Sequence, residues 1–264
     1  MPEPKPTLLA LDFDGVICDG LIEYFKTAWR AYCQLWKPHD EIPPPGLAEQ
    51  FYRLRPVVES GWEMPLVLRS LLLGQSEAEI LVNWGAIAQA LVADEHLVPA
   101  ELSATVDRIR DEWIAADLED WLSQHRFYPG IIERLRQTLA SPVQTVIITT
   151  KEGRFVRQLL QQQQVDLAES QIFGKEVRQP KSQTLRDLQQ KLGRDGERDP
   201  QIWFVEDRLK TLQSIYAQPD LQTVRLFLGD WGYNTSADRE AAQQDERITL
   251  LSLAEFAQDF AEWI

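Results

Sequence analysis

Short, nearly continuous hydrophobic runs recur along the chain and alternate with segments whose apolar residues follow helical spacing. Such runs are typical of strands that are buried on both faces of a parallel sheet. They occur at residues 7–13, 144–149, 201–205, 223–228 and 248–252, with a shorter candidate at 170–174. The helical patterns cover 131–140, 152–164, 182–192, 208–217 and 253–263. This alternation predicts an α/β fold, a doubly wound, Rossmann-like parallel sheet.

The alternation stops between about Gly20 and His125, where no strand pattern is convincing. Long amphipathic stretches fill this segment instead, at 22–36, 48–55, 77–91 and 102–123. Six of the nine tryptophans also lie there, so the segment has the bulky side chains that a core of its own requires. We therefore expect two domains, a Rossmann-like core formed by residues 1–19 and 126–264, and an inserted all-α cap formed by residues 20–125.

The formal net charge of −14 argues against nucleic acid or an anionic membrane as the main partner, since both require a basic surface. No apolar stretch approaches the roughly 20 residues of a membrane helix. The first seven residues lack the apolar segment of a secretory signal. Only two cysteines occur, Cys18 and Cys33, and we expect both to be reduced. These features favour a cytoplasmic protein.

Polar side chains that are suited to catalysis or metal binding directly follow the predicted strands. Because the carboxyl ends of parallel strands meet at one edge of a sheet, we expect these side chains to gather there. Lys181 opens the helix that precedes the 201–205 strand. The other residues at the strand ends are Asp12, Asp14 and Gly15, then Thr149, Thr150 and Lys151, and finally Glu206 and Asp207.

Carboxylates that share a site with a lysine and a hydroxyl indicate phosphoryl transfer. Close carboxylates repel one another unless a cation joins them, and their oxygens suit Mg²⁺. An aspartate such as Asp12 can attack phosphorus and form an aspartyl-phosphate. A second carboxyl two residues away, Asp14, can protonate the leaving oxygen and then deprotonate water. Gly15 allows a sharp turn that presents backbone amides to a phosphate.

Four of these segments, in this order, resemble the motifs of one known family. Leu11–Val16 (Leu-Asp-Phe-Asp-Gly-Val) is similar to the first motif of the haloacid dehalogenase superfamily, Ile147–Lys151 to the second, Lys181 to the third and Phe204–Asp207 to the fourth. The resemblance covers the whole core and is strongest to the branch of phosphoglycolate phosphatases and β-phosphoglucomutases, which carry a helical C1-type cap. Tyr128–Gly130 and Trp231–Asn234 also resemble members of this branch.

The resemblance implies a role for each matching residue. Asp12 would be the nucleophile and a metal ligand, and Asp14 the general acid and base, with its backbone carbonyl on the metal. Thr149 would bind the phosphoryl oxygens, and Lys181 would steady the nucleophile and the phosphate. Asp207 and Glu206 would complete the Mg²⁺ site. Further candidates for substrate binding are Thr150, Gly15 and, in the cap, Arg55.

Two departures from the family pattern concern the metal and the lysine. Lys210 and Thr211 stand where many members have another acid, which leaves Glu206 to complete the metal site. Lys181 follows a proline, whereas a proline more often comes after this lysine, and Lys175 is a weaker rival for its role.

The sequence thus predicts a Mg²⁺-dependent phosphatase that hydrolyses a small phosphorylated metabolite through an aspartyl-phosphate. We expect a monomer or a homodimer with no nucleic-acid or membrane partner. A phosphomutase of the same superfamily is the alternative among enzymes, because the four motifs do not distinguish the two. A non-catalytic binding or regulatory protein on the same fold is the alternative from another class.

Overall fold

The computed structural model describes residues 5–194 and 200–264. The chain divides into two compact units. The first, here called the core unit, consists of the described residues of Met1–Asp19 and Arg126–Ile264, and the second, the helical unit, is Gly20–His125. Each unit is described below by itself.

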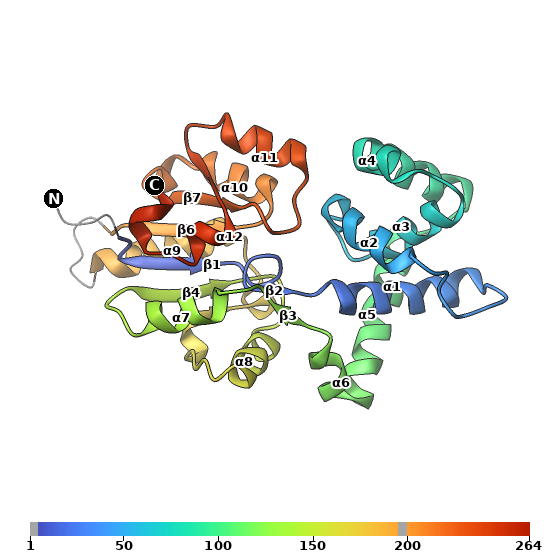
Figure 1. Cartoon of the computed structure of the whole chain (residues 1–264), viewed down its shortest axis with the longest axis horizontal. Coiled ribbons are helices and arrows are strands. Elements are labelled where there is room, and N and C mark those ends of the chain that lie inside the picture. Colours follow the sequence, from blue (N-terminus) through green and yellow to red (C-terminus); the bar gives the residue numbers. More distant parts are fainter. Residues whose placement is uncertain (1–4, 195–199) are drawn as a thin grey trace. The chain divides into compact units, whose positions relative to one another are not determined.

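The core unit contains a six-stranded sheet in which every pair of neighbours is parallel. The strand order is β5-β4-β1-β6-β7-β8, and Figure 1 shows β4, β1, β6 and β7 side by side in this order. The bounds of the strands are β1 Leu8–Leu11, β4 Gln144–Ile148, β5 Ile172–Phe173, β6 Ile202–Glu206, β7 Arg225–Gly229 and β8 Ile248–Leu251. All six hydrophobic runs form strands, and the predicted α/β fold with a Rossmann-like parallel sheet is confirmed.

Helices cover this sheet on both faces. They are α7 Ile131–Leu139, α8 Gly153–Gln162, α9 Lys181–Arg194, α10 Leu209–Tyr216, α11 Ser236–Gln243 and α12 Leu253–Phe256. Leucines of α9 and α10 join alternate strand residues, such as Phe204 and Leu226, in one buried cluster. The residues between them, Trp203 and Phe227, point to the opposite face because side chains alternate along a strand. There they pack on Trp263, with ring centroids 5.8 and 5.5 Å apart.

The hydrophobic pattern missed one helix and one strand pair of the core unit, and it gave the wrong extent for another helix. Helix α11 has few apolar residues, and it begins instead with a capping box between Thr235 and Asp238. The predicted helix 253–263 is wrong as one element, since α12 ends at Phe256 and a 3₁₀ turn follows at Phe260–Trp263. A two-stranded antiparallel pair, β2 Cys18–Asp19 with β3 Arg126–Phe127, is too short to show a hydrophobic period.

In the helical unit, which is described throughout, every regular element is a helix. The elements are α1 Leu21–Trp36, α2 Leu47–Leu54, α3 Glu63–Leu72, α4 Glu77–Asp94, α5 Pro99–Ala116 and α6 Leu118–Ser123, with a 3₁₀ turn at Arg55–Val57. The expected continuous stretch 102–123 is wrong, because the chain breaks at Asp117, which caps α6 by accepting the N–H of Asp120 (2.9 Å). The buried carboxylate of Glu23 binds Arg110 (Nε–Oε1, 2.7 Å) and ties α1 to α5.

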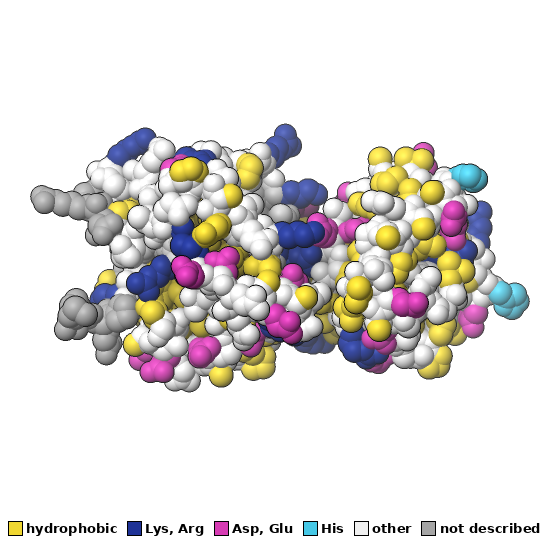
Figure 2. Space-filling model, turned by 90° about the horizontal axis from the view of Figure 1, so that it is seen from above, with side chains coloured by type: hydrophobic (Ala, Val, Ile, Leu, Met, Phe, Trp, Pro, Cys, Tyr) yellow, Lys and Arg dark blue, Asp and Glu magenta, His cyan; other side chains and the backbone are white. Residues whose placement is uncertain are grey.

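On the face seen in Figure 2, hydrophobic side chains gather on the helical unit. Its exposed large hydrophobic residues are Ile42, Leu72, Leu73, Leu81, Val82 and Val98. Among the described helices of the chain, none combines the length and the apolar character that a membrane span requires. Both cysteines are free thiols.

Candidate active site

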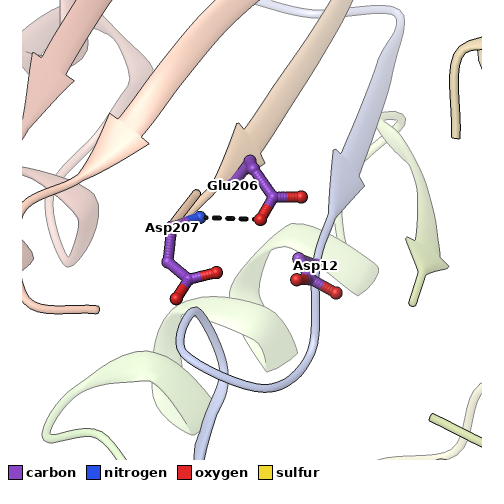
Figure 3. Close-up of side chains that lie close together, drawn as sticks. All are labelled: Asp12, Glu206 and Asp207. Carbon is purple, nitrogen blue, oxygen red and sulfur yellow. Dashed lines mark hydrogen bonds between the residues drawn. The ribbon is translucent and has the colours of Figure 1, made fainter. Parts of the chain in front are cut away.

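Asp12 and Glu206 lie side by side at the carboxyl edge of the sheet. Leu11 pairs with Val205 in the register of β1 and β6, so the next residues of both segments fall at the same level. Figure 3 shows the carboxylates of Asp12, Glu206 and Asp207 close together. One oxygen from each lies within 4.8 Å of the others, and all three side chains are buried. This donor set fits a small divalent cation that prefers oxygen ligands.

Lys181, the first residue of α9, lies against this acidic cluster. Its Nζ is 2.9 Å from Asp12 Oδ2 and 2.7 Å from Glu206 Oε2. The other oxygen of Glu206 accepts the backbone N–H groups of Asp207 (3.2 Å) and Arg208 (3.1 Å). Glu206 therefore has partners on both oxygens, and it fixes the Lys181 ammonium beside Asp12.

The cluster is electrostatically unfavourable with all three carboxyls ionised. Burial raises the pKa of Asp12 to about 7, although Lys181 opposes this rise, and the charge of Glu206 adds to it. Burial also raises the pKa of Glu206 and that of Asp207, and each rises further beside a neighbouring acid. Burial lowers the pKa of Lys181, but the two carboxylates that it binds raise it above its ordinary value. A cation among the carboxylates would relieve this repulsion.

The loop between β7 and α11 orients Asp207. Tyr233 donates its backbone N–H to Asp207 Oδ2 (2.8 Å). The side chain of Asn234 donates to the backbone oxygens of Asp207 (3.1 Å) and Gly229 (2.7 Å). Neither Tyr233 nor Asn234 was a site candidate from the sequence. The available signals were the family resemblance of Trp231–Asn234 and the position of this segment soon after a strand end, at the same sheet edge as the acids.

Two glycines make the close packing around Asp207 possible. Gly15 has φ +89°, and a Cβ there would lie 2.2 Å from Asp207 Oδ2. A Cβ on Gly232 would lie 2.3 Å from Asp207 Cβ and 2.5 Å from the backbone oxygen of Gly15. Both positions therefore exclude any side chain while Asp207 keeps its place.

We expect Gly232→Ala to lower the free energy of unfolding of the full chain by about 2 kcal/mol, because the new methyl group collides with backbone as well as side-chain atoms. Urea denaturation followed by tryptophan fluorescence measures this. Gly193→Ala is the matched control, because a Cβ there meets nothing within 4 Å and alanine is the better helix former. Equal stability of the two variants would contradict the expectation.

Asp14 and Thr149 also lie at this sheet edge, and both interact with Lys151. The Lys151 ammonium is 3.1 and 3.3 Å from the two carboxylate oxygens of Asp14. The Lys151 backbone N–H donates to Thr149 Oγ1 (3.2 Å). The sequence placed Lys151 at the end of β4 but assigned it no function.

The remaining candidates for substrate binding are less closely tied to the acidic cluster. Thr150 is exposed at the end of β4. Arg55 belongs to the helical unit, where its Nη1 donates to Val58 O (2.9 Å) and its guanidinium lies 4.9 Å from the Tyr24 ring centroid. Lys175, the rival of Lys181, has an exposed side chain.

No family model and no curated protein matches this chain, but solved structures match it along most of its length. One is a predicted phosphatase from Clostridium acetobutylicum, at 12% identity and a TM-score of 0.57, over 96% of this chain and 97% of that one. Another is a predicted phosphoglycolate phosphatase from Haemophilus somnus, at 16% identity and a TM-score of 0.55, over 87% and 88%. A third is a haloacid dehalogenase-like family hydrolase from Streptococcus pneumoniae, at 15% identity and a TM-score of 0.51, over 94% of both chains.

The chain has the haloacid dehalogenase-like fold. The resemblance inferred from the four sequence motifs is thus confirmed at the level of the fold. Residues from three of the four motifs, Asp12, Lys181 and Glu206, are in direct contact or in neighbouring positions at one sheet edge of this fold.

Proposed function

We propose that this protein is a Mg²⁺-dependent phosphatase that hydrolyses a small phosphomonoester through an aspartyl-phosphate. The observation that carries the proposal is the position of Asp12 in a buried cluster with Glu206 and Asp207, and in contact with Lys181. On this proposal, the nucleophile, the metal ligands and a fixed cation lie together at one sheet edge. Phosphoryl transfer through an aspartyl-phosphate uses these components in one place.

In the first half of the reaction, an oxygen of Asp12 bonds to phosphorus and the bond from phosphorus to the ester oxygen breaks. Asp14 gives its proton to the departing oxygen, so the alcohol leaves neutral. Lys181 holds Asp12 by Oδ2 (2.9 Å), which limits the rotation of the nucleophile. Its positive charge also stabilises the anionic phosphoryl oxygens.

In the second half, Asp14 takes a proton from water, and the water oxygen attacks phosphorus. The bond from phosphorus to Asp12 breaks, and phosphate and the free carboxylate are formed. Thr149, in a buried position at the end of β4, is proposed to bind a phosphoryl oxygen. Gly15 and Thr150 are proposed to contact the substrate from the same edge.

Asp12 and Asp207 are proposed as metal ligands, together with Glu206 and the backbone carbonyl of Asp14. When bound, Mg²⁺ would neutralise negative charge on the transferring phosphoryl group. We further propose that the helical unit acts as the cap and selects the leaving group, with Arg55 among its specificity residues, and that the partner of the protein is a small phosphorylated metabolite.

A panel of phosphomonoesters tests the proposal with the full chain. We expect release of inorganic phosphate that requires Mg²⁺ and stops with excess EDTA. A mutase would instead transfer the phosphoryl group to a second hydroxyl and depend on a bisphosphate primer. Absence of phosphate release from every ester, with Mg²⁺ present and the fold intact by circular dichroism, would contradict the proposal, and if no phosphoryl transfer occurred with a bisphosphate primer either, a binding role would be left.

A further inference from the structure

The proposed mechanism gives no task to Lys151, although its ammonium binds both carboxylate oxygens of Asp14 at 3.1 and 3.3 Å. Both partners are largely enclosed, with 9% of the Lys151 side chain and 17% of the Asp14 side chain exposed. An ion pair this shielded from solvent keeps its geometry better than an exposed one. We propose that Lys151 is a positioning residue, which holds the Asp14 carboxyl where it exchanges protons with the leaving group and with water.

The backbone on both sides of this ion pair is tightly fixed. The Lys151 N–H donates to Thr149 Oγ1 (3.2 Å), and the Lys151 carbonyl accepts the N–H of Lys175 (2.9 Å). Asp14 lies in a turn that is closed by a hydrogen bond from the N–H of Gly15 to the carbonyl of Cys18 (2.8 Å). The ammonium therefore reaches Asp14 from an anchored chain, and it restricts the side-chain torsions of the acid.

The two-oxygen contact leaves room for proton transfer. A protonated carboxyl still has an oxygen that accepts hydrogen bonds, so one oxygen of Asp14 can stay with Lys151 while the other carries the proton. Without the lysine, the carboxyl would sample several rotamers, and the fraction in reach of the leaving oxygen would fall. This inference rests on the proposed function, since it assumes that Asp14 is the general acid and base.

The test compares leaving groups that differ in their need for an acid. An aryl phosphate such as p-nitrophenyl phosphate releases a stable anion, whereas β-glycerophosphate releases a strongly basic alkoxide unless it is protonated. For Lys151→Gln we expect kcat/KM to fall about tenfold or more with the alkyl ester and less than about threefold with the aryl ester. Lys151→Arg, which keeps the charge, should recover most of the alkyl activity. Lys191→Gln, at the exposed end of α9, is the control for loss of a positive charge.

A double-mutant cycle then asks whether Lys151 acts through Asp14. If it does, Lys151→Gln causes no further loss in an Asp14→Asn background. An equal fall with both esters, a rise in KM at unchanged kcat, or additive losses in the double variant would each overturn the inference. Those results leave the proposed function standing, because each of them is measured against a wild-type chain that releases phosphate from both esters, whereas the proposed function fails if the wild-type chain releases phosphate from no ester of the panel.

Discussion

Replacing Asp12 with asparagine is expected to reduce phosphate release by about 10⁴-fold or more, because the other two carboxylates of the buried cluster are already held by other groups. Glu206 has partners on both of its oxygens, including Lys181, and Asp207 is held by the backbone of Tyr233. The asparagine keeps the size of the side chain, and it removes one charge from a crowded acidic cluster. We therefore expect the fold to survive the change.

Initial rates with saturating Mg²⁺ and circular dichroism of the same samples measure this result. Asp166→Asn, at an exposed position outside the site, is the matched control and should keep wild-type activity. Acid quenching during turnover, followed by mass spectrometry, should detect one phosphoryl group on the wild-type chain and none on the variant. A folded Asp12→Asn variant with more than about a tenth of wild-type activity would contradict the assignment of the nucleophile.

Replacing Asp207 with asparagine is expected to abolish the stabilisation of the chain by Mg²⁺. A ligand that binds only the folded state at about 100 times its Kd adds about 2.7 kcal/mol to the free energy of unfolding. Asparagine can still accept the N–H of Tyr233 through its side-chain oxygen, so the loop contact (2.8 Å) remains possible. It loses, however, the charge that a Mg²⁺ ligand contributes. The loss of one buried carboxylate also reduces repulsion, so the metal-free variant should be at least as stable as the metal-free wild type.

Thermal denaturation of both chains, with excess MgCl₂ and with EDTA, measures this second effect without any assay of activity. The wild type should show a higher Tm with Mg²⁺, and Asp207→Asn should show almost none of this increase. Asp166→Asn again serves as the control. If Asp207→Asn responds to Mg²⁺ like the wild type, the metal does not bind at this cluster and the proposed site is wrong.

The hydrophobic pattern was sufficient for the sheet because its central strands, such as β1 and β6, are buried on both faces. Such strands form continuous apolar runs, and the six runs match the six strands. The same reasoning failed where burial does not set the pattern. Helix α11 is defined by the capping box of Thr235, and the break before α6 is defined by the cap that Asp117 forms. Both depend on one or two polar side chains and leave no periodic signal.

The sequence also determined which residues could carry the chemistry, because each of them directly follows a strand or opens a helix. Asp12, Lys181, Glu206 and Asp207 were candidates on that ground alone. Parallel strands end at one edge, so residues separated by nearly 200 positions had to come together there.

Only the tertiary structure decided how these side chains pair. It joined Lys151 to Asp14 and Lys181 to Asp12, and it brought the backbone of Tyr233 to Asp207. These pairings depend on distances of about 3 Å between loops that are remote in sequence, and no spacing rule specifies them. The sequence thus determined the fold and the chemical groups at its sheet edge, whereas packing determined which lysine binds which carboxylate.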